Sequence, residues 1–446
     1  MSLDADALVI GAGPAGASTA ILLAGAGWRV ILIEQHRYPR RKVCGECLAP
    51  GTLASLDALG VGASLQDVAG PELRQLGWMG KGRPVIADMP VCTDAPYRYG
   101  RALGRQYLDT LLLERARSVG VQVLQPARMR KICGGPGRFE CEYEWLSRGA
   151  QDAGHSPAPT DAIQRGQRGP AGALCVRLIV DARGSWGRRG QICTDYDGLV
   201  PRTPGALRTA GAAGAAPYCD DLLAFKASFR DTNLPPGLLL LLPLAGAYGG
   251  MVVSDHGRTT VACCVRRDVL DRCRRLSPDH SAGEAIETYL HRSGRGICDM
   301  LGNAHREGPW LAVGPVRPGI CLATLPGALC VGNAAGSTQP LTGEGIGMAI
   351  ESAILLADQL SERPVGSIDA ACGLQIQRAY SQAWRRRFAP RLRFASICAH
   401  IAMRPWLAAP AGRLLRGLPG ALTFSARLAG KARHPCIHPT LIREAA

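Results

Sequence analysis

Apolar residues near the N-terminus occur in short runs separated by glycines. Leu8 to Ile10 form one run that leads into the loop from Gly11 to Gly16, and a segment of small residues typical of a helix follows. A second apolar run extends from Arg29 to Ile33 and ends at Glu34. This order predicts a strand, a tight turn, a helix and a second strand, as in the first half of a nucleotide-binding domain.

A second glycine-rich break lies near the other end of the chain. Residues 328–360 begin with a short apolar run, pass through glycines at 332–336 and 343–347, and continue as an amphipathic segment, which predicts a strand, a loop and a helix. The first turn of a helix has backbone amides without intrahelical partners, and these favour an electron-rich ligand. Two such helix starts are suited to holding one long cofactor.

The middle of the chain alternates between strand-like runs and irregular segments. Residues 222–230, 238–242 and 259–267 have the composition of strands and predict an antiparallel sheet. Residues 134–173 contain many Gly, Pro and Gln residues and predict a polar loop inserted between two strands. Residues 201–217 predict another connection made of small residues.

The uncharged stretch at residues 232–254 approaches the length of a membrane span. Prolines and glycines divide it, so it predicts a buried strand ending at Pro243, a Gly-Ala-Tyr-Gly-Gly turn and a second strand. The N-terminus has acidic residues where an export signal carries basic ones, and the seventeen cysteines are scattered and odd in number. These features predict a soluble, cytoplasmic protein.

The basic charge is concentrated towards the C-terminus. Only five of the 52 basic residues are lysines, which indicates a compositional bias, but residues 370–443 contain thirteen Arg and Lys and no Asp or Glu. Pro405, Pro410 and Pro419 predict that this region forms short amphipathic helices. Such a surface is suited to anionic lipid at a membrane surface, an acidic carrier protein or a phosphorylated substrate, or it is a solvated face. Few aromatic residues argue against nucleic acid.

The first glycine-rich loop has the spacing of a dinucleotide-binding turn. Gly11 allows the tight turn, Gly13 lets a pyrophosphate approach the backbone, and Gly16 lets the helix pack closely on the strand. Glu34 ends the second strand, where its carboxylate can accept hydrogen bonds from both hydroxyls of an adenosine ribose. The expected nucleotide contacts are Gly11, Gly13, Pro14, Ala15, Gly16, Glu34 and Gln35.

Two further segments give the chain a family resemblance. KVCG at residues 42–45 and PLTGEGI at residues 340–346, with the nucleotide loop, resemble the geranylgeranyl reductase branch of a flavoprotein superfamily. The superfamily also contains p-hydroxybenzoate hydroxylase and the flavin-dependent halogenases, and the resemblance covers residues 5–360. It implies FAD along the nucleotide domain, a β-sheet substrate domain over the isoalloxazine ring, and NAD(P)H as the electron donor without a nucleotide domain of its own.

The resemblance also assigns residues to the cofactor. Arg105 matches an arginine that opens a helix beside FAD, and Ala182 replaces a glycine of the family's Asp-Gly segment. Asn333 stands where the family usually has an aspartate that binds the ribityl chain, and its amide can still accept that hydrogen bond. The other cofactor residues that the resemblance implies are Arg41, Cys44, Gly45, Ala334, Gly343, Gly345 and Ile346.

The pair Cys44 and Cys47 admits several interpretations. No second C-x-x-C motif and no His cluster completes a metal site, so we expect no metal. Cys44 is a candidate catalytic residue at the flavin face, Cys47 is expected to be a buried apolar residue, and a dithiol that passes electrons to flavin is an alternative. Tyr248 is the second catalytic candidate, and Phe225 and Lys226 either face the substrate or pack in the sheet.

The expected fold is an α/β, Rossmann-like FAD-binding domain interleaved with an antiparallel substrate domain, plus a helical C-terminal region. These parts are assigned to residues 1–75, 96–195 and 305–362, to residues 76–95 and 196–304, and to residues 363–446.

The expected function is an FAD-dependent oxidoreductase that uses NAD(P)H on a hydrophobic, unsaturated, isoprenoid- or polyketide-like substrate, free or carrier-bound. Reduction of a C=C bond is favoured over hydroxylation of an aromatic or polyketide substrate. A non-catalytic flavin- or lipid-binding protein is a further alternative. Halogenation is disfavoured because the chain has no Trp-x-Trp-x-Ile-Pro segment.

Overall fold

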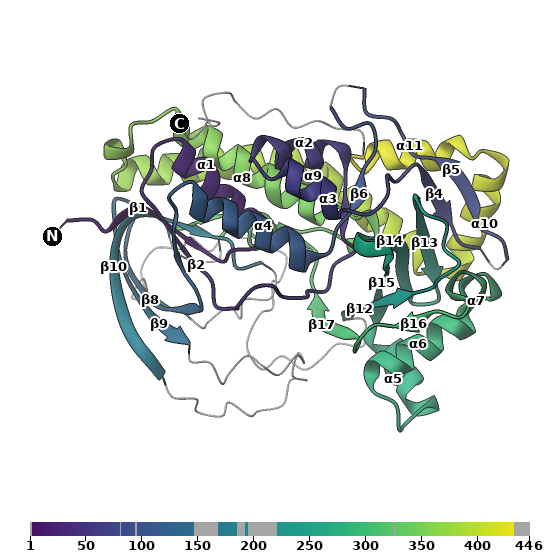
Figure 1. The fold of residues 1–446 in the computed structure, drawn as a ribbon. Helices are drawn as coiled ribbons and strands as arrows, with labels where there is room; N and C mark the ends of the chain where they lie inside the picture. The colour runs from purple at the N-terminus through teal and green to yellow at the C-terminus, as the bar shows by residue number, and fades with distance from the viewer. Residues whose placement is uncertain are drawn as a thin grey trace.

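The protein is built around two eight-stranded sheets at opposite ends of an elongated molecule (Figure 1). The computed structural model describes residues 2–80, 82–93, 96–146, 168–184, 192–194, 221–323, 325 and 327–431. The segment 201–217 and residues 147–167 of the polar loop expected at 134–173 lie outside the described residues, whereas residues 138–146 and 168–173 of that expected loop form strands.

The first sheet has a parallel centre and an antiparallel edge. Strand β1 pairs in parallel with β2 and β10, β2 pairs with β7, and β10 pairs antiparallel with β9. Its strands are β1 (Ala5–Ile10), β2 (Val30–Ile33), β7 (Gln122–Leu124), β8 (Ala127–Gly135), β9 (Arg138–Leu146), β10 (Arg168–Asp181), β11 (Cys193–Thr194) and β19 (Leu329–Cys330).

Alternate residues of β1 enter two different cores, as expected for a strand buried on both faces. Ala7 and Val9 pack with the helices α1, α4 and α8, whereas Leu8 and Ile10 pack with residues of β8 and β9. The helices of this half are α1 (Pro14–Gly25), α2 (Pro50–Ala58), α3 (Gly62–Val68), α4 (Arg105–Ser118) and α8 (Gly345–Ser361).

The second sheet is mostly antiparallel, as the strand pattern predicted. Residues 222–230 form β12, and the run predicted at 259–267 forms β15 and ends at Arg266. The remaining strands are β4 (Gln75–Trp78), β5 (Val85–Asp88), β13 (Leu238–Leu244), β14 (Ala247–Val253), β15 (Thr259–Arg266), β16 (His305–Arg306) and β17 (Leu311–Val316). Strands β16 and β17 pair with β12, so the second sheet extends past residue 304, where the sequence placed the domain boundary.

The charge-free stretch at residues 232–254 forms two strands, β13 and β14, as predicted. Pro243 lies within β13 rather than at its end, and the turn is the shorter pair Ala245 and Gly246, so Tyr248 lies in β14 opposite Pro243. Gly246 adopts a φ of +74°, which favours glycine in a two-residue hairpin. Within the described ranges, no helix combines the length and apolar character needed to cross a membrane.

Helices cover both faces of the second sheet. Leu238 and Leu240 point towards α5 (Arg267–Leu276), α6 (Ala282–Ser293) and α7 (Arg295–Leu301), whereas Leu239 and Leu241 point towards the C-terminal helices. The leucine run is therefore continuous because both faces of β13 are buried. Short pairings complete the fold: β3 (Cys47–Leu48) with β6 (Arg101–Ala102), and β18 (Gly319–Ile320) with β20 (Gly336–Ser337).

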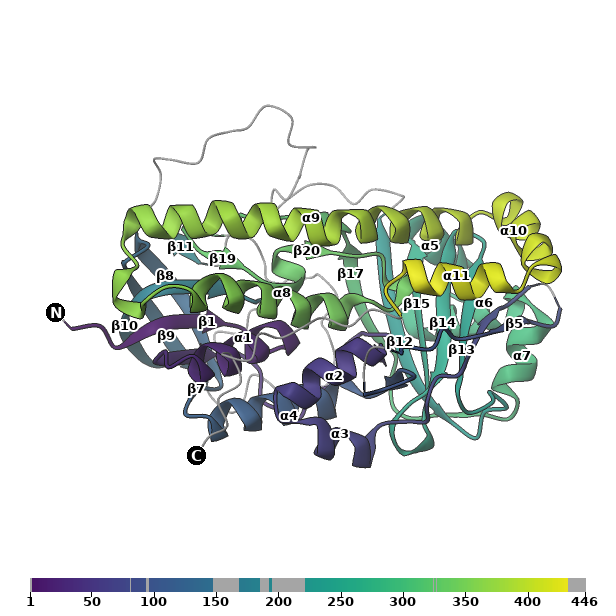
Figure 2. The same cartoon turned by 90° about the horizontal axis from the view of Figure 1, so that it is seen from above.

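The C-terminal region is helical, but its first helix is not short. Helix α9 (Ala370–Ala402) has 33 residues and runs along both halves of the molecule (Figure 2). Its buried aromatic residues Tyr380, Trp384 and Phe388 pack on the core of the first half, and this packing stabilises a helix that the sequence pattern alone did not reveal.

Two of the three prolines separate helices as predicted. Pro405 is the first residue of α10 (Pro405–Gly417), where its missing amide hydrogen costs nothing, and Pro419 precedes α11 (Gly420–Leu428). Pro410, in contrast, lies inside α10, so the break expected there is absent.

Candidate active site

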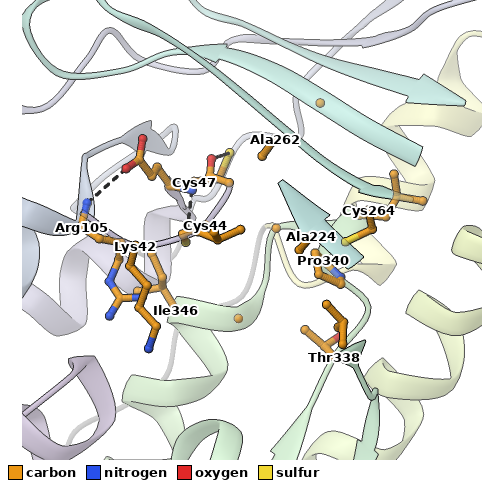
Figure 3. Close-up of a pocket in the computed structure, with 18 of the residues that line it drawn as sticks. Lys42, Cys44, Cys47, Arg105, Ala224, Ala262, Cys264, Thr338, Pro340 and Ile346 are labelled. Carbon is orange, nitrogen blue, oxygen red and sulfur yellow. Dashed lines mark hydrogen bonds between the residues drawn. The ribbon is translucent and has the colours of Figure 1, made fainter. Parts of the chain in front are cut away.

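A cavity of about 210 Å³ lies where the loops of the first sheet meet the second sheet. Both glycine-rich loops and the Cys44 loop line one side, and β12, β13, β14 and β15 line the other (Figure 3). The sequence-predicted residues that line it are Gly13, Pro14, Ala15, Cys44, Gly45, Arg105, Tyr248, Asn333, Gly343, Gly345 and Ile346. The two loops, more than 300 residues apart, therefore reach one cavity.

The first loop has the geometry that its glycines suggested. Gly11 has a φ of +101°, and a Cβ on Gly16 would lie 1.8 Å from the Gly11 oxygen, so a side chain at either position is excluded. A Cβ on Gly13 would meet only the Arg105 Nη2 atom, at 3.6 Å. Gly11 and Gly16 thus shape the turn, while Gly13 leaves its backbone open to the cavity.

Glu34 holds the far end of this loop together. It is buried, its Oε2 accepts a hydrogen bond from the Ala12 amide at 2.9 Å, and its Oε1 accepts one from the His36 amide at 2.8 Å. The adjacent Gln35 side chain contacts the His36 ring at 3.1 Å. The carboxylate lies at the end of β2 next to the turn, which is the place of the ribose-binding acid in dinucleotide sites.

Two cations form a basic wall beside Gly13. Arg105, the first residue of α4, is buried and donates to both oxygens of Asp109 at 2.6 and 2.7 Å. Burial, with nearby Arg105 and Arg40, lowers the pKa of Lys42 to about 7. In the described part of the chain, Lys42 forms no ion pair with a carboxylate, so an anionic ligand such as a pyrophosphate would find an available cation there.

The second loop consists of two short 3-10 turns followed by α8. The first turn, Gly332–Ala334, carries Asn333 into the cavity wall, and the Gly332 amide donates to Ser352 Oγ at 2.7 Å. The second turn, Pro340–Thr342, ends at Gly343. This residue has a φ of +62°, a left-handed backbone conformation that favours glycine. A Cβ on Gly345 would meet no atom within 4 Å, so the start of α8 is open to a ligand.

The cysteine loop also reaches the cavity. Cys44 and Cys47 are free thiols; Cys44 is partly buried and lines the cavity, whereas Cys47 is buried. Burial raises the pKa of Cys47 to about 11, so this thiol stays protonated at neutral pH. The buried position of Cys47 agrees with its interpretation as an apolar residue, although it also contributes to the cavity wall.

Glu46, between these cysteines, is a central residue that the sequence analysis did not single out. It is buried at a φ of +62°, and its Oε1 accepts from the Arg105 amide at 3.2 Å and pairs with the ammonium of Lys226. Its Oε2 accepts from Thr260 Oγ1 at 2.6 Å. The network joins the cysteine loop, the start of α4 and the second sheet. A sequence signal was present only as a charged residue inside an otherwise apolar and small-residue motif.

Glu344, in the second loop, is a further residue that sequence reasoning missed. It is buried, pairs with the Arg391 guanidinium of α9, and lies 3.4 Å from the Lys431 ammonium. Arg391 also donates to Glu351 at 2.8 and 2.9 Å. The second loop is therefore tied to the C-terminal helices by charge.

Some predicted residues lie elsewhere. Arg41 donates to Ser228 Oγ at 2.9 Å and to the Glu307 carbonyl at 3.2 Å, so its guanidinium joins the two halves instead of lining the cavity. Phe225 lines the cavity, whereas Lys226 pairs with Glu46. Gly11, Gly16, Glu34, Gln35 and Ala334 do not line the cavity.

Tyr248 faces the cavity from β14. Its hydroxyl donates to Gln339 Oε1 at 2.6 Å, and burial raises the pKa of the phenol well above its usual value. The side chain therefore carries its proton at neutral pH. A neutral phenol next to a cavity can donate a hydrogen bond or a proton to a ligand.

Comparisons with known proteins agree with this geometry. Residues 4–135 match the family model of an FAD binding domain. Menaquinone reductase from Mycobacterium tuberculosis H37Rv is 28% identical over 371 residues, covering 82% of this chain and 80% of that protein. Menaquinone reductase from Mycolicibacterium smegmatis is 26% identical over 426 residues, covering 91% of this chain and 89% of that protein.

Two solved structures show the fold. The myxobacterial chondrochloren halogenase superposes with a TM-score of 0.67 at 19% identity, covering 98% of this chain and 95% of that one. A geranylgeranyl bacteriochlorophyll reductase-like protein from Thermoplasma acidophilum superposes with a TM-score of 0.63 at 17% identity, covering 98% of this chain and 94% of that one.

The FAD binding domain, the second sheet and the cavity between them define an FAD-dependent oxidoreductase. Over most of its length the chain is similar to menaquinone reductases, and its fold is that of a flavin-dependent halogenase and of a geranylgeranyl reductase-like protein. Both the expected fold and the resemblance seen in the sequence are thereby confirmed.

Proposed function

We propose that the protein reduces a carbon–carbon double bond of a hydrophobic, isoprenoid-like substrate with electrons from NAD(P)H. The observation that carries this proposal is the wall of the cavity opposite the basic residues. It consists mainly of apolar side chains from the second sheet, with no charged residue among them: Ala224, Phe225, Leu239, Leu241, Val252, Ala262 and Val316. Such a wall favours an apolar chain over a charged or polar ring.

The relatives support the same choice. The menaquinone reductases align with more than four-fifths of this chain, including both sheets. The match to 6-methylpretetramide 4-monooxygenase of Streptomyces rimosus is 38% identical but covers only 113 residues, a quarter of this chain. The reductases thus resemble this chain over its substrate half as well as its nucleotide half.

The residues of the cavity have distinct roles in this proposal. Gly13, Lys42 and Arg105 hold the pyrophosphate of FAD, and Glu34 holds the adenosine ribose. Asn333 and Gly345 hold the flavin end. Bound FAD supplies hydride transfer from NAD(P)H to the substrate.

Two side chains act near the reacting bond in this proposal. Cys44 forms part of the flavin-facing wall, and the phenol of Tyr248 would give its Oη proton to the substrate carbon and regain a proton from solvent after the product leaves. The apolar wall from β12 to β15 excludes water.

The test is an anaerobic reaction of the purified protein with NADH or NADPH, followed by an isoprenoid naphthoquinone. We expect the flavin to be bleached by the nicotinamide and reoxidised by the quinone, and the side chain of the product to gain two hydrogen atoms by mass analysis. Oxygen-dependent hydroxylation of the substrate, without anaerobic reduction, would instead establish a monooxygenase. A flavin spectrum unchanged by either nicotinamide would indicate a binding protein.

A further inference from the structure

The C-terminal helices expose an unusual number of large apolar side chains. Ten large apolar residues are exposed in the described ranges, and six of them lie between residues 397 and 428: Ile397, Trp406, Leu414, Leu418, Phe424 and Leu428. Trp406 is 70% exposed, and α10 has no fully buried residue. Helices α10 and α11 lie next to each other at the end of the molecule away from the first sheet (Figures 1 and 2). Their outer sides are called the α10–α11 face below.

Arginines accompany these apolar residues. Arg413 follows Trp406 by seven residues and so lies on the same side of α10, and Arg416 and Arg427 are also exposed. None of these three arginines pairs with a carboxylate in the part of the chain that the structure describes. Residues 370–443 contain no Asp or Glu, so no acidic side chain of this segment offsets their charge. The face is both apolar and cationic.

A second cavity lies directly beneath the α10–α11 face. Its volume is about 190 Å³, and it is enclosed by α9, α10, α11 and the outer side of β4 and β13. Leu414 lines it and is also 59% exposed, so the cavity reaches the surface at this face. Leu239, Leu241 and Leu341 line both this cavity and the active-site cavity. The two cavities therefore share an apolar wall, made of these leucine side chains, between the α10–α11 face and the active site.

We propose that the α10–α11 face docks on the surface of an anionic lipid bilayer. A partner for this face must accept protruding Trp, Leu and Phe side chains while offering negative charge to the arginines. The boundary between headgroups and acyl chains does both. The second cavity then opens towards the membrane, so a hydrophobic substrate can pass from lipid to the active site without crossing water. This last step rests on the proposed function, whereas the docking itself does not.

The test measures binding of the full-length, FAD-loaded protein to sedimenting vesicles. One set is made of phosphatidylcholine alone and the other contains phosphatidylglycerol as well. The variant combines Trp406→Ser, Leu418→Ser and Phe424→Ser, none of which lines either cavity. The matched control is Leu276→Ser on α5, since Leu276 is as exposed as Trp406, at 70%. No substrate is present.

We expect the wild-type protein and the Leu276→Ser control to bind anionic vesicles, and the triple variant to bind about tenfold more weakly or less. Neutral vesicles should bind all three proteins weakly. The triple variant should still reduce substrate that is dispersed in detergent. This activity assay distinguishes a failure of the proposed reaction from a failure of membrane docking. Equal binding by the triple variant and the control would overturn the proposal. If the wild-type protein binds no vesicles, the proposal is also overturned, and an acidic carrier protein becomes the favoured partner.

Discussion

Two buried glutamates hold the active-site loops in different ways. Glu46 belongs to the cysteine loop, and Glu344 belongs to the second glycine-rich loop; each neighbours a glycine and each is 4% exposed or less. Glu46 binds one cation, one hydroxyl and one backbone amide. Glu344 lies between two cations, Arg391 and Lys431.

The partners of the two glutamates show which part of the protein holds each loop in place. Glu46 connects its loop to the substrate-side sheet through Lys226 of β12, whereas Glu344 connects its loop to the C-terminal helices. Part of the basic charge of the C-terminal region is thus structural, because Arg391 and Lys431 are buried against Glu344. The exposed arginines of the α10–α11 face remain for a partner.

The largest effect is expected for Lys226→Met. Glu46 would lose the one cation that it contacts among the described residues while remaining buried, which costs about 3–5 kcal/mol in comparable buried ion pairs. Denaturant unfolding of the apoprotein should show this loss of stability. The double variant Glu46→Gln with Lys226→Met should recover much of it, because no uncompensated charge is left. If the single variant is as stable as the wild type, the pair does not hold the loop.

A smaller effect is expected for Arg391→Met. Glu344 would keep Lys431 as a partner, and Glu351 would keep Arg387 at 3.3 Å, so the three charged hydrogen bonds of Arg391 are lost without leaving an isolated charge. We expect a loss of about 2–3 kcal/mol in the unfolding free energy. If Arg391→Met lowers the unfolding free energy more than Lys226→Met does, the expected order of the two ion pairs is wrong.

Lys42 is a partly buried charge, and in the described part of the chain no carboxylate forms an ion pair with it. Its pKa of about 7 lies below the 10.5 of a lysine in the unfolded chain. At pH values between 7 and 10.5, Lys42 carries a proton in the unfolded chain but not in the folded apoprotein. The free energy of unfolding therefore rises with pH. From pH 6.5 to 8 the rise from this group should be about 1 kcal/mol, and Lys42→Met should abolish it. An identical pH dependence in both proteins would contradict this.

The smallest effect is expected for Lys431→Met. Its ammonium is 3.4 Å from Glu344, and Arg391 stays in place, so we expect a loss of about 1 kcal/mol or less. Chemical unfolding alongside Arg391→Met would measure it. A loss equal to that of Arg391→Met would mean that the two cations contribute equally to holding the second loop.

Local features of the fold were predictable from the sequence. The strand at residues 222–230 and the turn from Gly11 to Gly16 follow from the spacing of apolar residues and glycines within about 15 residues, and the helix that begins at Arg105 was expected from the family resemblance. The convergence of the two glycine-rich loops was predictable because both precede helices and resemble one family's motif.

The pairings between distant residues were not predictable in this way. Glu46 and Lys226 are 180 residues apart, and Glu344 and Arg391 are 47 apart. The length of α9 depends on the burial of Trp384 against the first half, which no local pattern encodes. Arg41 was assigned to the cofactor from the family resemblance, yet its guanidinium donates a hydrogen bond to Ser228.

The central claim is that both glycine-rich loops hold one FAD, and titration of the apoprotein with FAD tests it most directly. Gly13→Leu and Gly345→Leu each place a side chain in the cavity, where the nearest atom to either Cβ is 3.6 Å away, so both variants should fold. Gly420→Leu is the control, because Gly420 opens α11 as Gly345 opens α8 and is equally unobstructed.

We predict one FAD per wild-type chain, unchanged binding by Gly420→Leu, and binding weaker by about tenfold or more in each of the two cavity variants. Wild-type affinity in Gly345→Leu, or a wild-type chain that binds no FAD, would contradict the account.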